Sequence, residues 1–242
     1  MTTDRPVESH QDTERSRELG GVRAAEGSRI AWLVVGLLGL GGFLVMTVLA
    51  YSHVTFSFDQ PLLDLARSWN AWADLWRLLS ESANIPLIII GLGMVAWLFV
   101  TKRRREAFVV LLLLIAITAG SEGVKQLVAR PRPEGTDPNI PGVVYSFPSG
   151  HVLEALTIFG IIAIRCWRVL QHFALKILIV ALVVVEVAMV GVARVALSAH
   201  FPSDVLASLF GGVAALALYG WLTRPGGFGD QRPEQHSASG RS

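Results

Sequence analysis

The sequence is poor in charged residues and in cysteine. Charged side chains make up 17% of the 242 residues and hydrophobic residues other than glycine make up 52%, whereas an average soluble domain is about 25% charged. With a formal net charge of only +2, this composition excludes a disordered chain, an ordinary cytosolic enzyme and a nucleic-acid binder that depends on bulk basicity. The single cysteine, Cys166, excludes an intrachain disulfide and a cysteine-based metal cluster.

The hydrophobic residues are concentrated in blocks. A membrane-spanning helix needs about 20 apolar residues, and six blocks reach or approach this length. They cover residues 30–51, 85–101, 107–124, 152–170, 174–196 and 205–222. The chain is therefore predicted to be an all-α protein, a six-span transmembrane helical bundle.

The two ends of the chain differ from these blocks. Residues 1–29 and 223–242 are polar and mixed in charge, and we predict that both are disordered tails flanking a membrane domain at 30–222. No signal-peptide cleavage site follows the first block, which is predicted to be a retained span. With six spans, both tails lie on the same side of the membrane. Lys and Arg are more frequent on that side, and basic residues near span ends favour the cytoplasm, so both termini are predicted to be cytoplasmic.

The first outer loop contains an amphipathic pattern. Large apolar residues recur there at spacings of three and four, which is typical of one helical face. They are Leu62, Leu65, Trp69, Trp72, Trp76 and Leu79. We interpret them as one helix lying in the outer membrane interface, which is either a surface anchor or a wall of a lipid entry path.

Polar residues gather in two segments on the predicted outer face, 122–151 and 194–204. Three cations lie there, Lys125, Arg132 and Arg194. Ser149 and Gly150 form a turn directly before a predicted helix, and the free N–H groups of such a helix start accept an anion. The residue types therefore indicate a binding site for a phosphate group.

Two histidines and an aspartate accompany this anion site. His151 begins the helix, and His200 lies four residues before Asp204, so that a carboxylate can hold one imidazole nitrogen and leave the other free to attack. The set suits phosphoryl transfer, in which one histidine attacks phosphorus and the other protonates the leaving group. No metal and no cofactor are predicted, because the two histidines and the aspartate could ligate a divalent ion only against three nearby cations.

The order of these residues resembles the three-part signature of the type 2 phosphatidic acid phosphatase superfamily. The matching motifs are Lys125-x6-Arg132-Pro133, Pro148-Ser149-Gly150-His151 and Arg194-x5-His200-x3-Asp204. The resemblance covers about residues 30–222, because members of this superfamily also have six spans and an outer amphipathic segment. One departure is Ala193, where the third motif usually has serine, and we expect its effect to be modest.

The resemblance implies a role for each matching residue. His200 would be the nucleophile that forms a phosphohistidine, Asp204 would orient it, and His151 would be the general acid. The phosphoryl oxygens would be held by Lys125, Arg132, Ser149, Gly150 and Arg194.

Other charged residues have more than one interpretation. Glu122 and Glu154 are candidates for tuning the site from outside it, and equally for structural ion pairing. Glu186, within the fifth predicted span, could line the pocket floor or contact the substrate, but a hydrogen bond to a neighbouring span is the favoured interpretation. For Arg67, Arg77 and Arg130 the favoured interpretation is a solvated or headgroup-binding side chain.

The resulting prediction is an integral inner-membrane enzyme whose site faces the periplasm or cell exterior. It would hydrolyse a lipid phosphate or diphosphate without metal, with a polyprenyl (undecaprenyl-type) diphosphate, a cell wall lipid carrier, favoured over phosphatidylglycerol phosphate or phosphatidic acid. The alternatives of other kinds are a non-catalytic lipid phosphate binder or transporter, a phosphatase for soluble sugar phosphates, and a vanadate-dependent haloperoxidase, against which six spans argue. The partners predicted are the substrate and the bilayer, with no nucleic acid, and the oligomeric state does not follow from the sequence.

Overall fold

A computed structural model describes residues 7–82, 85–136 and 145–224. The described residues form helices and no strand, apart from one isolated bridge between Pro131 and Tyr145. The helices are α1 (Val7–Tyr51), α2 (Asp59–Arg67), the 3-10 helix η1 (Asn70–Trp72), α3 (Ala73–Ser82), α4 (Ile85–Val100), α5 (Arg104–Val128), α6 (Gly150–Val169), α7 (Phe173–Ala196) and α8 (Pro202–Leu222). The predicted all-α class agrees with this part of the chain.

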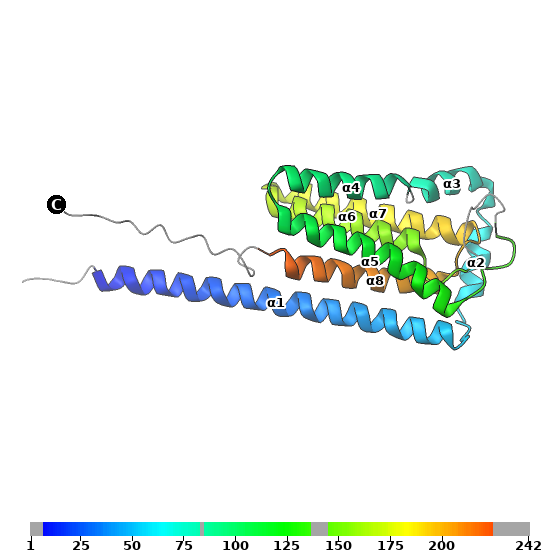
Figure 1. Ribbon diagram of the computed structural model, residues 1–242, viewed down its shortest axis with the longest axis horizontal. Coiled ribbons are helices and arrows are strands. Elements are labelled where there is room, and N and C mark those ends of the chain that lie inside the picture. Colours follow the sequence, from blue (N-terminus) through cyan, green and yellow to red (C-terminus); the bar gives the residue numbers. More distant parts are fainter. Residues whose placement is uncertain (1–6, 83–84, 137–144, 225–242) are drawn as a thin grey trace, which may run out of the picture.

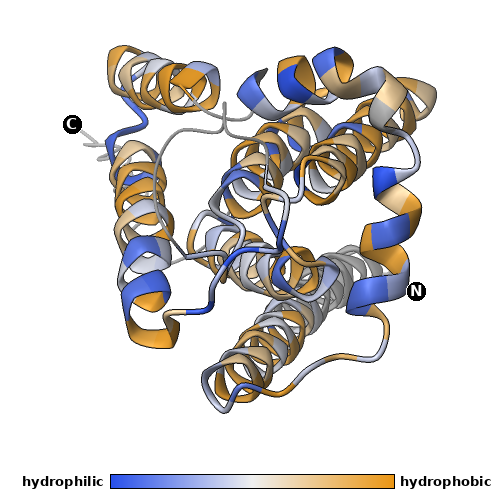
Figure 2. Ribbon diagram, turned by 90° about the vertical axis from the view of Figure 1, so that its right-hand side faces the viewer, coloured by the Kyte–Doolittle hydropathy of each residue, from blue (hydrophilic) through white to orange (hydrophobic). Residues whose placement is uncertain are grey.

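The long helices run side by side, and α2 lies across one end of the bundle (Figure 1). The surfaces of the long helices are largely hydrophobic, whereas hydrophilic segments cross the end that carries α2 (Figure 2). Five described segments are long and apolar enough to cross a membrane. They are Gly27–Tyr51, Ala73–Val100, Arg104–Val128, Phe173–Ala196 and Pro202–Leu222.

The sixth predicted span corresponds to α6, which is not among these five segments. This helix carries the charged residues Glu154, Arg165 and Arg168, and it packs between α5, α7 and α8. Its buried side chains include Val152, Ile158 and Ile161. Because protein rather than lipid covers much of α6, its residues need not be uniformly apolar, and the count of six spans stays a prediction.

Helix α1 packs closely against α8. A Cβ atom placed on Gly39 would lie 2.8 Å from the backbone nitrogen of Ala214, so only glycine permits this approach. Farther along, the indole of Trp32 occupies the space beside Gly220. The last turn of α8 lies at the end of the bundle opposite α2, and α1 extends well beyond it in the same direction (Figure 1).

Two sequence predictions differ from this fold. Residues 7–29, expected to be disordered, belong to α1, while the predicted C-terminal tail from residue 225 lies outside the described residues. The apolar stripe is not one continuous interfacial helix, because α2, η1 and α3 divide it. Trp76 Nε1 donates to the carbonyl of Trp69 at 3.1 Å, and Trp76 is buried, so α3 belongs to the bundle and leads into α4.

Candidate active site

The predicted site residues meet at the end of the bundle that carries α2. Six segments reach this end (Figure 1). They are the C-terminal turn of α5, the segment before α6, the first turn of α6, the last turn of α7, the α7–α8 connection and the first turn of α8. The site residues that these segments carry are Lys125, Arg132, Ser149, Gly150, His151, Arg194, His200 and Asp204. Contacts and electrostatic interactions described below connect several of them.

His200 is 2% exposed and has a defined tautomer. Its Nδ1 lies 2.6 Å from the carbonyl oxygen of Ser146, and because a carbonyl can only accept, Nδ1 must carry the proton. The other ring nitrogen, Nε2, is therefore unprotonated in the neutral ring, and it lies 3.4 Å from Nη2 of Arg194. A lone pair thus faces the cationic side of the site, as a nucleophile requires.

Asp204 lies behind His200 and is fully buried. Its Oδ2 is 3.7 Å from His200 Nδ1, which is longer than a hydrogen bond, and it accepts the backbone N–H of Phe201 at 2.9 Å. The Ser146 carbonyl, which sequence reasoning missed, is therefore the hydrogen-bond partner that orients the imidazole. Asp204 acts on the ring through its charge across a short distance.

Three buried polar atoms in this region lack a hydrogen-bond partner among the described residues. They are Arg132 Nε, Ser149 Oγ and Arg194 Nε. Orphaned donors of this kind are costly in a folded protein, and an oxyanion is the kind of acceptor that they lack. Arg194 is otherwise fixed from α3, since its Nη1 donates to Ser80 Oγ at 2.7 Å.

Lys125 and His151 complete the site from α5 and α6. A Cβ atom on Gly150 would lie 3.7 Å from Lys125 Nζ and 3.8 Å from Ser121 Oγ, so the ammonium group lies beside the N-terminal turn of α6. His151 is half-buried and lies within electrostatic reach of Lys125, Arg194 and His200. The cations, the helix start and both histidines therefore surround one place.

Arg130 was predicted to be a solvated or headgroup-binding side chain, and this is wrong. Its guanidinium is 12% exposed and bridges two buried carboxylates, with Nη1 at 2.6 Å from Asp204 and Nη2 at 2.8 Å from Asp59. Asp59 also accepts the backbone N–H of Ser203 at 2.8 Å and its hydroxyl at 2.7 Å. Phe201 covers the guanidinium, 4.2 Å from its ring centre. Arg130 and Asp59 thus support Asp204 from behind.

Arg67 and Arg77, the two other arginines given this interpretation, have different surroundings. Arg67 Nε donates to Ser198 Oγ at 3.0 Å, so this residue ties α2 to the α7–α8 connection. Arg77 forms an ion pair at 2.6 Å with Asp74, whose side chain is 98% exposed. The surface interpretation therefore suits Arg77 better than Arg67.

The three glutamates occupy different places. Glu122 forms a short ion pair with Lys125, which supports the helical pairing considered for it. Glu154 accepts a hydrogen bond from Thr118 at 3.3 Å, and both acids line a cavity of about 370 Å³ between α4, α5 and α6. Glu186 is half-buried on α7, outside the residues that surround His200. Within the described ranges, no three His, Cys, Asp or Glu side chains are grouped so that they could hold a metal ion.

Burial lowers the pKa of His200 to about 4, with Arg194 and Arg132 adding to the effect and Asp204 opposing it. An exposed histidine titrates near pH 6.5, so we expect the His200 ring to stay neutral down to about pH 5. NMR of protein labelled at histidine Cε1, with His200→Ala to assign the signal, would measure this. Since the unfolded chain binds the proton at higher pH than the folded one, stability should fall as the pH drops from 6.5 to 4. A midpoint near 6.5 would contradict the buried environment.

The fold and the site define a class of protein. The chain belongs to the PAP2 superfamily, whose family model matches residues 106–226, a range that runs from α5 through α8 and contains all eight site residues. This match confirms the predicted family. Together with the similarity to a curated phosphatase, described below, it identifies the chain as a lipid phosphatase. The hydrophobic helices agree with an integral membrane protein.

Two comparisons identify relatives from one organism. The chain is 27% identical over 175 residues to phosphatidylglycerophosphatase B of Bacillus subtilis (strain 168), an alignment that covers 68% of this chain and 82% of the relative. A solved structure of a transmembrane PAP2 type phosphatidylglycerolphosphate phosphatase from Bacillus subtilis superposes with a TM-score of 0.60 and 23% identity. The superposition covers 76% of this chain and 94% of the solved chain. This similarity supports the helical fold described above.

Proposed function

We propose that this enzyme hydrolyses phosphatidylglycerol phosphate to phosphatidylglycerol and inorganic phosphate. The sequence favoured a polyprenyl diphosphate and gave phosphatidylglycerol phosphate as an alternative, and the names of the two relatives support the alternative. Polyprenyl diphosphate is the second candidate, because the same cationic site accepts any terminal phosphate group.

One observation carries the proposed mechanism: His200 presents an unprotonated Nε2 to a cluster of buried arginine and serine donors. Nε2 attacks the terminal phosphorus, and the bond between phosphorus and the lipid oxygen breaks. In the free enzyme, burial and the nearby Arg194, His200, Lys125 and Arg132 lower the pKa of His151. The negative charge of the bound phosphate offsets these cations, so His151 takes up a proton when substrate binds and donates it to that oxygen, which leaves as the lipid alcohol. The Ser146 carbonyl and the Asp204 carboxylate stabilise the positive charge of the phosphorylated imidazole ring.

Water completes the reaction. His151, now neutral, takes a proton from water as it attacks phosphorus, and the bond between Nε2 and phosphorus breaks to release inorganic phosphate. In both steps Lys125, Arg132 and Arg194 stabilise the charge on the equatorial oxygens. Ser149 Oγ and the Gly150 N–H donate to the same oxygens. No step requires a metal ion.

We also propose the placement of the enzyme in its membrane. Six helices would span the inner membrane, with α6 as the sixth, and both chain ends would be cytoplasmic. The cationic segment around Lys102 and Arg103 lies at the end of α4 opposite the site, and the positive-inside rule puts that end in the cytoplasm. The site would then face the periplasm or cell exterior, at the headgroup level of the outer leaflet.

Phosphate release by the purified protein in detergent, with EDTA present, tests the substrate and the metal requirement together. The compounds are phosphatidylglycerol phosphate, phosphatidic acid, polyprenyl diphosphate and a soluble sugar phosphate, with His200→Ala as the blank. We expect phosphatidylglycerol phosphate to have the highest kcat/KM, and EDTA to have no effect.

Other outcomes of this assay each contradict a defined part of the proposal. A preference for polyprenyl diphosphate would select the second candidate. Loss of activity in EDTA, restored by a divalent ion, would contradict the metal-free mechanism. Release from the sugar phosphate alone would exclude a lipid substrate, and no release from any compound would contradict the proposed reaction.

A further inference from the structure

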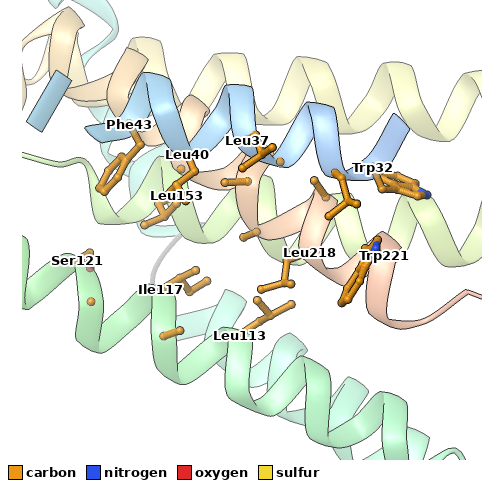
Figure 3. A pocket seen from close by; sticks show the side chains of 18 of the residues that line it. Trp32, Leu37, Leu40, Phe43, Leu113, Ile117, Ser121, Leu153, Leu218 and Trp221 are labelled. Atoms are coloured by element: carbon orange, nitrogen blue, oxygen red, sulfur yellow. The ribbon is translucent and has the colours of Figure 1, made fainter. Parts of the chain in front are cut away.

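A long apolar pocket of about 480 Å³ runs along the bundle between α1, α5 and α8 (Figure 3). One face of α1 and one face of α5 form its walls, and small residues of α8 form much of its floor. The wall and floor residues that the argument uses are Gly36, Gly120, Gly211, Ala214 and Ala215. We refer to this pocket as the α1–α5 groove.

One end of the α1–α5 groove adjoins the phosphate site. Ser121 lies at this end (Figure 3), and its Oγ is 3.8 Å from the position of a Cβ on Gly150. Lys125 follows one turn later on the same helix, and its Nζ lies 3.7 Å from that position. A molecule whose phosphate is held at Lys125 and Gly150 therefore has the mouth of the groove directly beside it.

The opposite end of the groove is marked by Trp32 and Trp221 (Figure 3). On α1 the lining extends from Trp32 to Phe43, which corresponds to about 16 Å at 1.5 Å per residue. The hydrocarbon core of a bilayer is about 30 Å thick, so the groove has about the length of one leaflet. Its dimensions suit a single extended hydrocarbon chain.

We propose that the α1–α5 groove binds one hydrocarbon tail of the lipid substrate while the phosphate is held by Lys125, Arg132 and Arg194. This tail site rests on the proposed function, since it requires a lipid whose phosphate reaches the site. Gly211, Ala214 and Ala215 carry no side chain larger than a methyl group, and this leaves the groove room for a chain. The tail is thereby held by the helices, with its reacting end aimed at His200.

Two other cavities are less suitable for the tail. The cavity between α4, α5 and α6 is lined by Glu122 and Glu154, and covering carboxylates with hydrocarbon is costly. A larger apolar pocket of about 600 Å³ lies between α2, α6, α7 and α8. Residues of α2, including Leu62 and Ala66, line that pocket, and its lining contains no hydroxyl, amide or charged side chain. The α1–α5 groove instead ends at Ser121, whose Oγ lies 3.8 Å from the position of a Cβ on Gly150.

Two glycines of α5 provide a matched pair for the test. A Cβ atom on Gly120 or on Gly123 meets no atom within 4 Å, so both positions accept leucine without a clash. Gly120 lines the α1–α5 groove, and Gly123 is exposed and is absent from its lining. The two substitutions therefore change the same helix in the same way and differ in whether they fill the groove.

The experiment measures kcat/KM for dipalmitoyl and dihexanoyl phosphatidylglycerol phosphate at equal mole fractions in mixed micelles. Gly120→Leu displaces about two methylene groups of the long tail, so we expect it to lower the dipalmitoyl-to-dihexanoyl ratio by about tenfold. Gly123→Leu should leave the ratio unchanged. Ala188→Phe, which fills the pocket lined by α2 and α7, should leave it unchanged as well.

Each other result has a definite meaning. Equal losses on both lipids in Gly120→Leu, or an unchanged ratio with an active parent protein, would overturn the tail site alone. A selective loss in Ala188→Phe would place the tail in the pocket beside α2 and would also overturn it. A parent protein that releases no phosphate from either lipid would instead contradict the proposed function, and the tail site with it.

Discussion

Replacing His200 by alanine is expected to lower phosphate release by roughly 10⁴-fold or more while leaving the protein folded. An enzyme that loses its nucleophile keeps only the contribution of binding and charge stabilisation. In this site the backbone carbonyl of Ser146 holds the imidazole in one tautomer, and none of the described contacts places a second unprotonated nitrogen against Arg194. Water, a weaker nucleophile, would have to attack in its place.

Single-turnover kinetics and thermal unfolding in detergent test this expectation together. His172→Ala is the matched control, because His172 is exposed and directly precedes α7 at the end of the bundle opposite the site. It should retain full activity. His151→Ala should slow both steps, and a phosphorylated protein that accumulates in this variant but never in His200→Ala would identify the attacking residue. Appreciable turnover by folded His200→Ala would rule out the phosphohistidine.

Replacing Arg130 by methionine is expected to have the largest effect on stability. The substitution leaves Asp59 and Asp204 close together, buried and without the cation that both contact. Breaking a buried ion pair by removing one partner costs about 3–5 kcal/mol. The two remaining like charges also repel each other, so Asp204 is displaced from its place behind His200. Its effect on the ring is then weakened, and kcat should fall with little change in KM.

Chemical denaturation and kcat, measured for Arg130→Met and for a surface control, would check this. Arg77→Met is the control, since its partner Asp74 is almost fully exposed and surface pairs contribute at most about 1 kcal/mol. Adding Asp59→Asn to Arg130→Met removes one of the two carboxylates and should recover part of the stability, which a double-mutant cycle would quantify. An effect no larger than that of Arg77→Met would show that Arg130 does not support the site.

Sequence reasoning predicted the helical class and named candidate site residues, because both inferences depend on local sequence patterns. The hydrophobic blocks identify their helices by length alone, and the motif residues lie within three short segments. Arg130 shares one of these segments with Arg132, but its partner Asp59 is 71 positions away. No local pattern connects them, so only the fold could distinguish the buried arginine from a surface one.

The Ser146 carbonyl illustrates a second kind of limit. Backbone acceptors carry no residue signature, and a sequence motif therefore names Asp204 as the partner of His200 while the shorter contact is with a peptide group. The broken amphipathic stripe has a similar origin. The spacing of its apolar residues is helical throughout, but Trp76 is buried against the bundle, so α3 packs as part of the bundle. Periodicity within one segment does not predict such tertiary packing.

The contributions to the site come from segments that alternate in direction through the bundle: Ser80 from α3, Lys125 from α5, His151 from α6, Arg194 from α7, His200 from the α7–α8 connection and Asp204 from the first turn of α8. In the proposed six-span arrangement, a chain inserted with any one of these helices inverted would carry that group to the opposite side of the membrane. Hydrolysis would then stop even though every residue is present. Activity of this enzyme consequently reports on the topology of its own insertion, and it could serve as a selectable marker for the machinery that inserts multi-span proteins.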